Sequence, residues 1–195
     1  MNGPYKIVLA SKSPRRIELL GDLGLEFTVM DTTVDESYPD HLVPEQVPLF
    51  LAGKKHDFAL ISQAQDDIIF ITADTVVICE GEILGKPADR EDAVEKLRKI
   101  SGKSHVVVTG VCIGNKTRRS CFDDRTEVFV EFMTDAEIIH YIDNFNVFDK
   151  AGAYGIQDWL GIAKISSITG SYTNVIGLPT QKLWKEINFF MQKES

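Results

Sequence analysis

The sequence lacks long apolar segments and an excess of basic residues, and each absence excludes a class of protein. No stretch approaches the ~20 consecutive apolar residues of a membrane-spanning helix. The first residues show no basic segment followed by an apolar run, so we expect no signal peptide. The net charge of −8 argues against a protein that coats a nucleic acid polymer or an anionic membrane.

Cysteine and histidine are few and scattered. The three cysteines are odd in number and have no metal-ligand spacing, so we expect reduced core or strand residues of a cytoplasmic protein: Cys79, Cys112 and Cys121. The four histidines form no metal-ligand pattern either. We find no repeat or linker, and we expect residues 1–195 to form a single domain large enough to bury its own core.

The stretch that follows the first apolar run has the composition of an anion site. Ser13 is a good helix N-cap and Pro14 suits the first helical position. Arg15 and Arg16 then stand where the helix dipole favours acidic residues. With the Ser11 and Ser13 hydroxyls and free helix N–H groups, they could cradle a phosphate. The alternative is a surface helix that carries two solvated arginines.

The remaining pattern mixes strand-like and helix-like segments. Residues 31–44 form a long polar loop of a length that is often functional. We expect an α/β fold, or α+β, with a mixed sheet. The expected strands are 5–9, 26–30, 68–79, 82–84, 106–113 and 126–133, and the expected helices begin at 14, 44, 89, 134 and 180.

Asp74 is the sharpest single candidate for chemistry. It lies between two β-branched runs, where a carboxylate is costly to bury unless it binds a cation or activates water. The alternatives are a strand end or a structural partner for a lysine. Lys86 follows the return strand of the hairpin that starts near Asp74, and a lysine suits a phosphate oxygen. A solvated turn lysine is an equally good interpretation of Lys86.

Residues 149–157 combine small residues with Lys150 and Gln157. Glycine lets a backbone approach a ligand closely, and the amide of Gln157 could read a base edge. A flexible loop has a similar composition, so this signal is weak alone. For Gly110 and for residues 170–179 we expect structural glycine turns.

Taken together and in this order, these blocks resemble the Maf family of nucleoside triphosphate pyrophosphatases. The resemblance covers nearly the whole chain. It rests on Ala10 to Arg16, Leu51-Ala52 with Lys55, Ala73-Asp74-Thr75, Gly85-Lys86-Pro87, Lys150 to Gln157, and Gly170-Ser171-Tyr172 with Gly177-Leu178-Pro179. It implies a fold of the inosine-triphosphate-pyrophosphatase type with two lobes and a central cleft. It also implies a homodimer that hydrolyses a nucleoside triphosphate to the monophosphate and pyrophosphate.

The resemblance also implies roles for individual residues. Asp74 matches the catalytic carboxylate, and Lys55 and Lys86 match lysines that face the phosphates. Glu36 matches an acidic residue of the metal region, and with Asp74 it would offer hard oxygen ligands to Mg²⁺ or Mn²⁺. The positions associated with the branch acting on dTTP and UTP are matched by Arg15, Thr75 and Gln157. The other residues expected to contact the substrate are Ser11, Arg16 and Lys150.

The chain departs from the family pattern in three places. Thr72 stands where glycine or alanine is common, and His56 follows Lys55 where alanine is usual. Residues 158–160, Asp-Trp-Leu, follow Gln157 where small residues are frequent, which would alter how the base pocket closes.

The sequence leaves the role of Asp74 open between proton acceptor and metal ligand. Nearby lysines and a metal are expected to keep its pKa low. Two other functions remain alternatives. The first is a nucleotide-binding regulator of cell division without turnover, and the second is a purine-directed housecleaning enzyme on the same fold.

Overall fold

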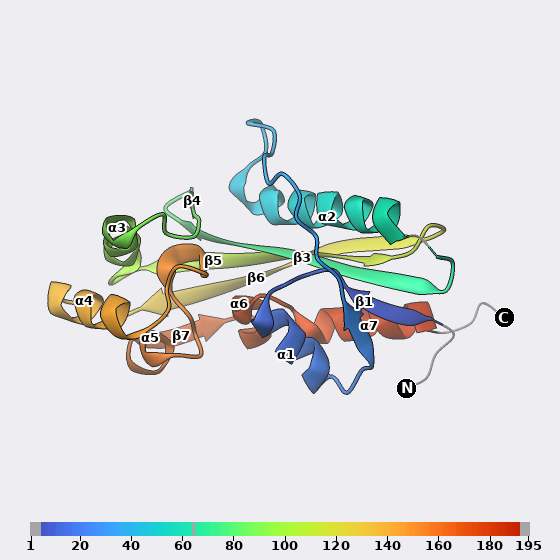
Figure 1. Cartoon of the computed structure of the whole chain (residues 1–195). Helices are drawn as coiled ribbons and strands as arrows, with labels where there is room; N and C mark the ends of the chain where they lie inside the picture. Colours follow the sequence, from blue (N-terminus) through green and yellow to red (C-terminus); the bar gives the residue numbers. More distant parts are fainter. Residues whose placement is uncertain (1–4, 64, 192–195) are drawn as a thin grey trace. The chain divides into compact units, whose positions relative to one another are not determined.

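The computed structural model describes residues 5–63 and 65–191 and has a mixed α/β fold (Figure 1). The described strands form a seven-stranded sheet of order β2-β1-β3-β5-β6-β7, with β4 paired to β3. This confirms the expected fold class. The strands are β1 (Lys6–Leu9), β2 (Phe27–Val29), β3 (Ile68–Cys79), β4 (Glu82–Leu84), β5 (Ser104–Gly114), β6 (Arg119–Val130) and β7 (Ile165–Thr169).

The chain divides into two compact units. The first comprises residues 1–74, 109–124 and 177–195, and the second comprises residues 75–108 and 125–176. No helix in the part of the chain that the structure describes has the length and apolarity needed to cross a membrane. The α-helices are α1 (Pro14–Asp22), α2 (Val47–Gln63), α3 (Arg90–Ile100), α4 (Asp135–Asn144), α5 (Trp159–Ala163), α6 (Tyr172–Ile176) and α7 (Thr180–Met191), and the 3-10 turns are η1 (Pro44–Gln46) and η2 (Ala151–Ala153).

In the first unit, β1 lies between β2 and β3 and is parallel to both. Helix α2 covers one face of these strands, while α1 and α7 cover the other (Figure 1). Ala59 of α2 packs with Val8 of β1 and Phe70 of β3 in one buried cluster. Burial of these apolar side chains holds α2 against the sheet.

Gly110 allows the start of α2 to approach β5 closely. A Cβ atom at this position would lie 2.3 Å from the backbone nitrogen of Leu49, so only glycine fits. The expectation of a turn at Gly110 was therefore wrong, because this residue lies in the middle of a strand. Its function is to let a helix backbone rest on the sheet.

Two of the three cysteines form a disulfide, which corrects the expectation that all three are reduced. Cys112 of β5 and Cys121 of β6 are bonded, and their Cα atoms are 4.2 Å apart. The two strands are neighbours in the sheet, and this pairing brings together residues that are nine positions apart in sequence. Cys79 is free and buried, as expected.

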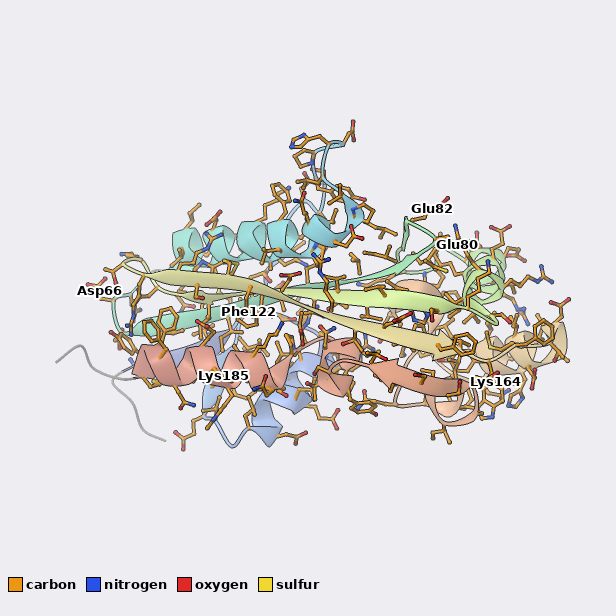
Figure 2. All side chains as sticks on the ribbon, turned by 180° about the vertical axis from the view of Figure 1, so that it is seen from behind. Asp66, Glu80, Glu82, Phe122, Lys164 and Lys185 are labelled. Carbon is orange, nitrogen blue, oxygen red and sulfur yellow. A yellow bond between two sulfur atoms is a disulfide. The ribbon has the colours of Figure 1, made fainter. Side chains whose placement is uncertain are left out.

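In the second unit, β3 turns back into β4 through Glu80 and Gly81. Both residues have a positive φ, which is the conformation of a tight hairpin turn. Figure 2 shows Glu80 and Glu82 at this hairpin, and Glu80 forms an ion pair with Lys103. A core that includes Leu97 of α3 and Tyr141 of α4 fills the unit.

The chain differs from the sequence-based expectations at three connections. Strand β6 begins at Arg119 rather than at residue 126, because residues 115–118 form a turn in which the Asn115 side chain accepts backbone N–H groups. The loosely alternating residues 162–168 include the end of helix α5. The glycine-punctuated residues 170–179 include helix α6. Helices α5 and α6 have only five residues each, and the periodicity of a helix needs a longer window to be recognised.

Candidate active site

Asp74 lies in the middle of β3 and is almost enclosed. Its side chain is 13% exposed, and the strand on either side is apolar and buried. Burial raises the pKa of the Asp74 carboxyl above its ordinary value, although Lys55 and Arg16 oppose the shift. The neighbouring positive charges of the protein do not by themselves keep this pKa low, because desolvation outweighs them; that a bound metal would lower it stays a prediction.

Lys55 connects Asp74 to a second carboxylate. Its Nζ atom lies 2.5 Å from Asp74 Oδ1 and 2.9 Å from Glu36 Oε1. Helix α2 presents Lys55 on its sheet-facing side, beside the buried residues Leu51 and Ala52. Glu36 comes from the long polar loop, and its side chain is 61% exposed. One buried ammonium group thus bridges an enclosed carboxylate and an accessible one.

Arg16 holds the backbone that carries Asp74. Its Nε donates to the carbonyl of Gly177 at 2.8 Å, and one terminal nitrogen donates to the carbonyl of Ala73 at 2.9 Å. The same nitrogen lies 3.5 Å from Ser11 Oγ. Burial lowers the pKa of the Arg16 guanidinium, and the negative charge of Asp74 opposes this. The first helix is therefore tied by its third residue, Arg16, to the residue that precedes Asp74.

The helix start is as expected, but its hydroxyls bond differently. Ser13 is the N-cap of α1 and Pro14 opens the helix, yet the Ser13 side chain makes no capping hydrogen bond. The buried Ser11 hydroxyl accepts the backbone N–H of Ser13 at 3.2 Å. Arg15 is half-buried and close enough to lower the pKa of Arg16. The structure thus brings Ser11, Arg15 and Arg16 together, and their contact with a phosphate remains a prediction.

Asp74 and Glu36 have the oxygen atoms that a hard divalent cation prefers, but two carboxylates alone do not complete its coordination. No group of three or more His, Cys, Asp or Glu side chains within residues 5–63 and 65–191 could hold a metal ion. Magnesium, however, is usually held by one or two carboxylates together with substrate phosphates and water. Asp74 and Glu36 both pair with Lys55, and binding of a metal ion by these two carboxylates remains a prediction.

The remaining predicted site residues belong to the second unit or its boundary. Thr75 directly follows Asp74 and is half-buried, whereas Lys86 and Gln157 are exposed. The backbone N–H of Gly152 donates to the carbonyl of Gly85, so the loop that carries Lys86 contacts the loop that carries Gln157. That Thr75, Lys86 and Gln157 act together with Asp74 remains a prediction.

Lys150 is engaged within its own loop. Its ammonium group donates to the carbonyl of Asn146 and lies 2.8 Å from Asp149 Oδ1. These contacts are typical of a residue that stabilises the backbone of a loop. A contact between Lys150 and a substrate therefore remains a prediction that competes with a structural role.

The sequence did not indicate which residues hold Asp74 and Lys55 in position relative to each other. The buried Thr72 hydroxyl donates to the carbonyl of Ala52 on α2 at 2.8 Å and lies 3.4 Å from the carbonyl of Cys112. It thereby links β3 to the helix that carries Lys55. The departure from the family pattern at Thr72 was the one signal available in the sequence. The backbone carbonyls that hold Arg16 leave no such signal.

The fold and the site define a mixed α/β protein with a buried, lysine-paired carboxylate on its sheet. The sequence profile of the family described as "Maf-like protein" matches residues 6–190. The chain belongs to the Maf family, which confirms the resemblance noted in the sequence.

Several bacterial proteins are similar to this chain over nearly its whole length. A protein of Bacteroides fragilis named "dTTP/UTP pyrophosphatase" is 50% identical over 184 residues, which cover 94% of this chain and 95% of that protein. A protein of Porphyromonas gingivalis with the same name is 46% identical, over 95% of this chain and 94% of that protein. A third, from Flavobacterium johnsoniae, is 40% identical, over 93% of this chain and 93% of that protein. Among solved structures, a HAM1 protein from Coxiella burnetii is similar with a TM-score of 0.42 and 18% identity, over 65% of this chain and 73% of that one.

Proposed function

We propose that this protein hydrolyses nucleoside triphosphates, dTTP and UTP above all, to the monophosphate and pyrophosphate. The observation that carries the proposal is the buried Asp74 carboxylate, with Lys55 Nζ 2.5 Å from Oδ1. Its support is the chain's 40–50% identity to relatives named "dTTP/UTP pyrophosphatase". A regulator that only senses nucleotides would need no buried carboxylate beside a lysine.

The chemistry requires that water attack the α-phosphorus while pyrophosphate leaves. Asp74 has two roles open to it, either to accept the proton of the attacking water or to hold the cation. A pKa raised by burial makes Asp74 a stronger base than an ordinary carboxylate. Lys55 orients Asp74 and Glu36, and Arg16 fixes the backbone at Ala73 so that the carboxylate stays in place.

The cofactor that we propose is Mg²⁺ or Mn²⁺. Asp74 and Glu36 would hold it, and when bound it would neutralise charge that develops on the phosphate oxygens. In the proposed reaction Lys55, Arg15, Arg16 and Lys86 add positive charge for the same phosphates.

The reaction panel that tests the proposal measures pyrophosphate release from dTTP, UTP, CTP, ITP and 7-methyl-GTP, with and without EDTA. We expect dTTP and UTP to be the best substrates and EDTA to abolish turnover. A preference for purines would favour the purine-directed enzyme instead. Tight binding of UTP with no pyrophosphate release would favour the regulator.

Asp74→Asn tests the proposed centre directly. The variant keeps the shape of the side chain but loses its basicity and charge, so kcat should fall by at least ~100-fold. Asp67→Asn is the matched control, because Asp67 lies just before the same strand, is about half exposed and forms an ion pair with Lys6 at the protein surface. Near-normal turnover in Asp74→Asn would remove Asp74 from the mechanism.

We further propose a cytoplasmic homodimer. The assembly rests on the family resemblance, and light scattering of the purified protein tests it. The net charge of −8 argues against a nucleic acid polymer or an anionic membrane surface as a partner, and a small anionic substrate requires that basic residues converge locally. The Cys112–Cys121 disulfide is unusual for a reducing cytoplasm. A count of reactive thiols with and without reductant establishes its state in cell extracts.

A further inference from the structure

One tyrosine hydroxyl in the second unit bonds to both sides of Gln157. Tyr141 of α4 is fully buried, and its hydroxyl donates to the Asp158 carboxylate, with both oxygens at 2.8 Å. The same hydroxyl accepts the backbone N–H of Gly155 at 3.0 Å. One donor and one acceptor function of a single hydroxyl thus hold the residues before and after Ile156 and Gln157.

The Asp158 side chain accepts this hydrogen bond instead of capping its own helix. It occupies the N-cap of α5, where an aspartate side chain normally accepts a backbone N–H, but it makes no capping hydrogen bond. The side chain is directed to Tyr141 instead. Burial raises the pKa of the Tyr141 hydroxyl above its usual range, so the hydroxyl keeps its proton and can donate at neutral pH.

Gly155 is closely packed beneath the same carboxylate. A Cβ atom on Gly155 would lie 2.7 Å from Asp158 Oδ2 and 2.9 Å from Lys150 Cε, so a larger residue would displace one of them. Lys150 is itself held by Asn146 and Asp149. The backbone at Gly155 therefore has little room to move.

The residue that directly precedes Gly155, Tyr154, is anchored by a second buried pair. His105 Nε2 and the Tyr154 hydroxyl are 2.6 Å apart, and both side chains are buried. Gln157, by contrast, is exposed. The loop thus combines a backbone held at two points with one accessible amide side chain.

Such rigidity suits recognition of a base edge. Uracil and thymine both present an N–H donor beside a carbonyl acceptor, and a glutamine amide complements this pair with two hydrogen bonds. Two simultaneous hydrogen bonds need the amide within about 0.5 Å of its required position, which only a supported backbone provides.

We infer that the Tyr141–Asp158–Gly155 clamp is a positioning device that holds Gln157 for recognition of the uracil or thymine ring. The inference rests on the proposed function, in which the substrate is dTTP or UTP. Tyr141 and Asp158 act through Gln157 and do not themselves contact the base. Asp158 therefore affects the affinity for the substrate by holding Gln157 in place.

The test compares binding of a non-hydrolysable UTP analogue with an α,β-methylene bridge, measured by calorimetry, in wild type and Tyr141→Phe. We expect the Kd of the analogue to rise about tenfold, the loss expected when one hydrogen bond to a charged group is removed. Inorganic tripolyphosphate carries no base, so its Kd should stay within twofold. Among turnover parameters, KM for UTP should rise with little change in kcat.

Two further variants complete the test. Tyr5→Phe is the matched control, since it removes a hydroxyl from a half-buried ring that stacks with Arg118 outside the clamp. Asp158→Asn keeps one acceptor oxygen for Tyr141, so the Kd should rise less than in Tyr141→Phe, by about threefold. Asp158→Asn also carries the test if Tyr141→Phe does not fold.

Three results would overturn the inference: an unchanged Kd for the analogue in both variants, an equal loss for tripolyphosphate, and no binding of the analogue by wild type. A wild-type protein that binds the analogue but releases no pyrophosphate from UTP or dTTP would refute the proposed function alone. A weaker Kd in Tyr141→Phe would support the clamp even then, because binding is measured without turnover.

Discussion

Mild acidification should destabilise the protein through two buried histidines. His56 of α2 and His105 of β5 are 0% and 2% exposed. Burial lowers the pKa of each from an ordinary value of 6.5 to about 4. Unfolded histidine binds a proton at pH 6.5, whereas these two resist protonation down to pH 4. The stability that the neutral forms provide is complete above pH 6.5 and is lost as the pH falls toward 4.

The loss of stability on acidification follows from the difference between the ordinary pKa of histidine, 6.5, and the lowered pKa of about 4 in the folded protein. Between about pH 7.5 and pH 5, one histidine with these values reduces the free energy of unfolding by about 2 kcal/mol, and both together by about 4 kcal/mol. Carboxylates with a lowered pKa contribute at lower pH, as for Glu137, whose hydrogen bond with Lys164 lowers its pKa to about 2. Urea unfolding followed by circular dichroism at the two pH values measures the change.

Variants separate the histidines from other titrating groups. His105→Gln should retain only about half of the wild-type pH dependence, whatever its stability at neutral pH. The exposed His41 provides the control His41→Gln, which should behave as wild type. Asp74, whose pKa is raised, changes stability in the opposite direction, but equally in wild type and variant. Equal pH dependence in wild type and His105→Gln would refute the assignment.

Two further predictions concern the links around the candidate site. Thr72→Val removes the hydroxyl that donates to the carbonyl of Ala52, so the free energy of unfolding measured in urea should fall by about 1–2 kcal/mol. Thr72→Ser keeps a hydroxyl and should retain most of the wild-type free energy of unfolding. A loss of equal size in both variants would show that packing, not the hydroxyl, matters. Reduction of the Cys112–Cys121 disulfide, which closes a short loop, should cost about 2.5 kcal/mol in the same assay. Cys121→Ser should be insensitive to dithiothreitol, and an unaffected wild type would contradict the prediction.

Elements with local signals were predictable from the sequence. Helix α1 begins at Pro14 after the Ser13 cap, and α4 begins after a capping box formed by Thr134 and Glu137. The Glu80-Gly81 turn between β3 and β4 lies where the sequence predicts it. In each case the signal involves residues within a few positions of one another, so neighbouring residues alone decide the conformation.

Elements that depend on distant partners were not predictable. Residues 119–125 are mostly polar, yet they form a strand because β5 offers an adjacent edge. The Cys112–Cys121 bond follows from that pairing, not from any spacing in the sequence. Helices α5 and α6 are too short for periodicity to reveal.

For the candidate site, the sequence alone determined the family, the proposed reaction and the residue types that carry charge. Asp74 stands out because it is a charge between two apolar runs, whereas Lys55 and Glu36 were indicated by the family resemblance. Only the tertiary structure decided that Lys55 bridges the two carboxylates and that burial raises the pKa of Asp74. Distances and desolvation depend on which distant segments pack around a group, and this packing is a property of the folded chain.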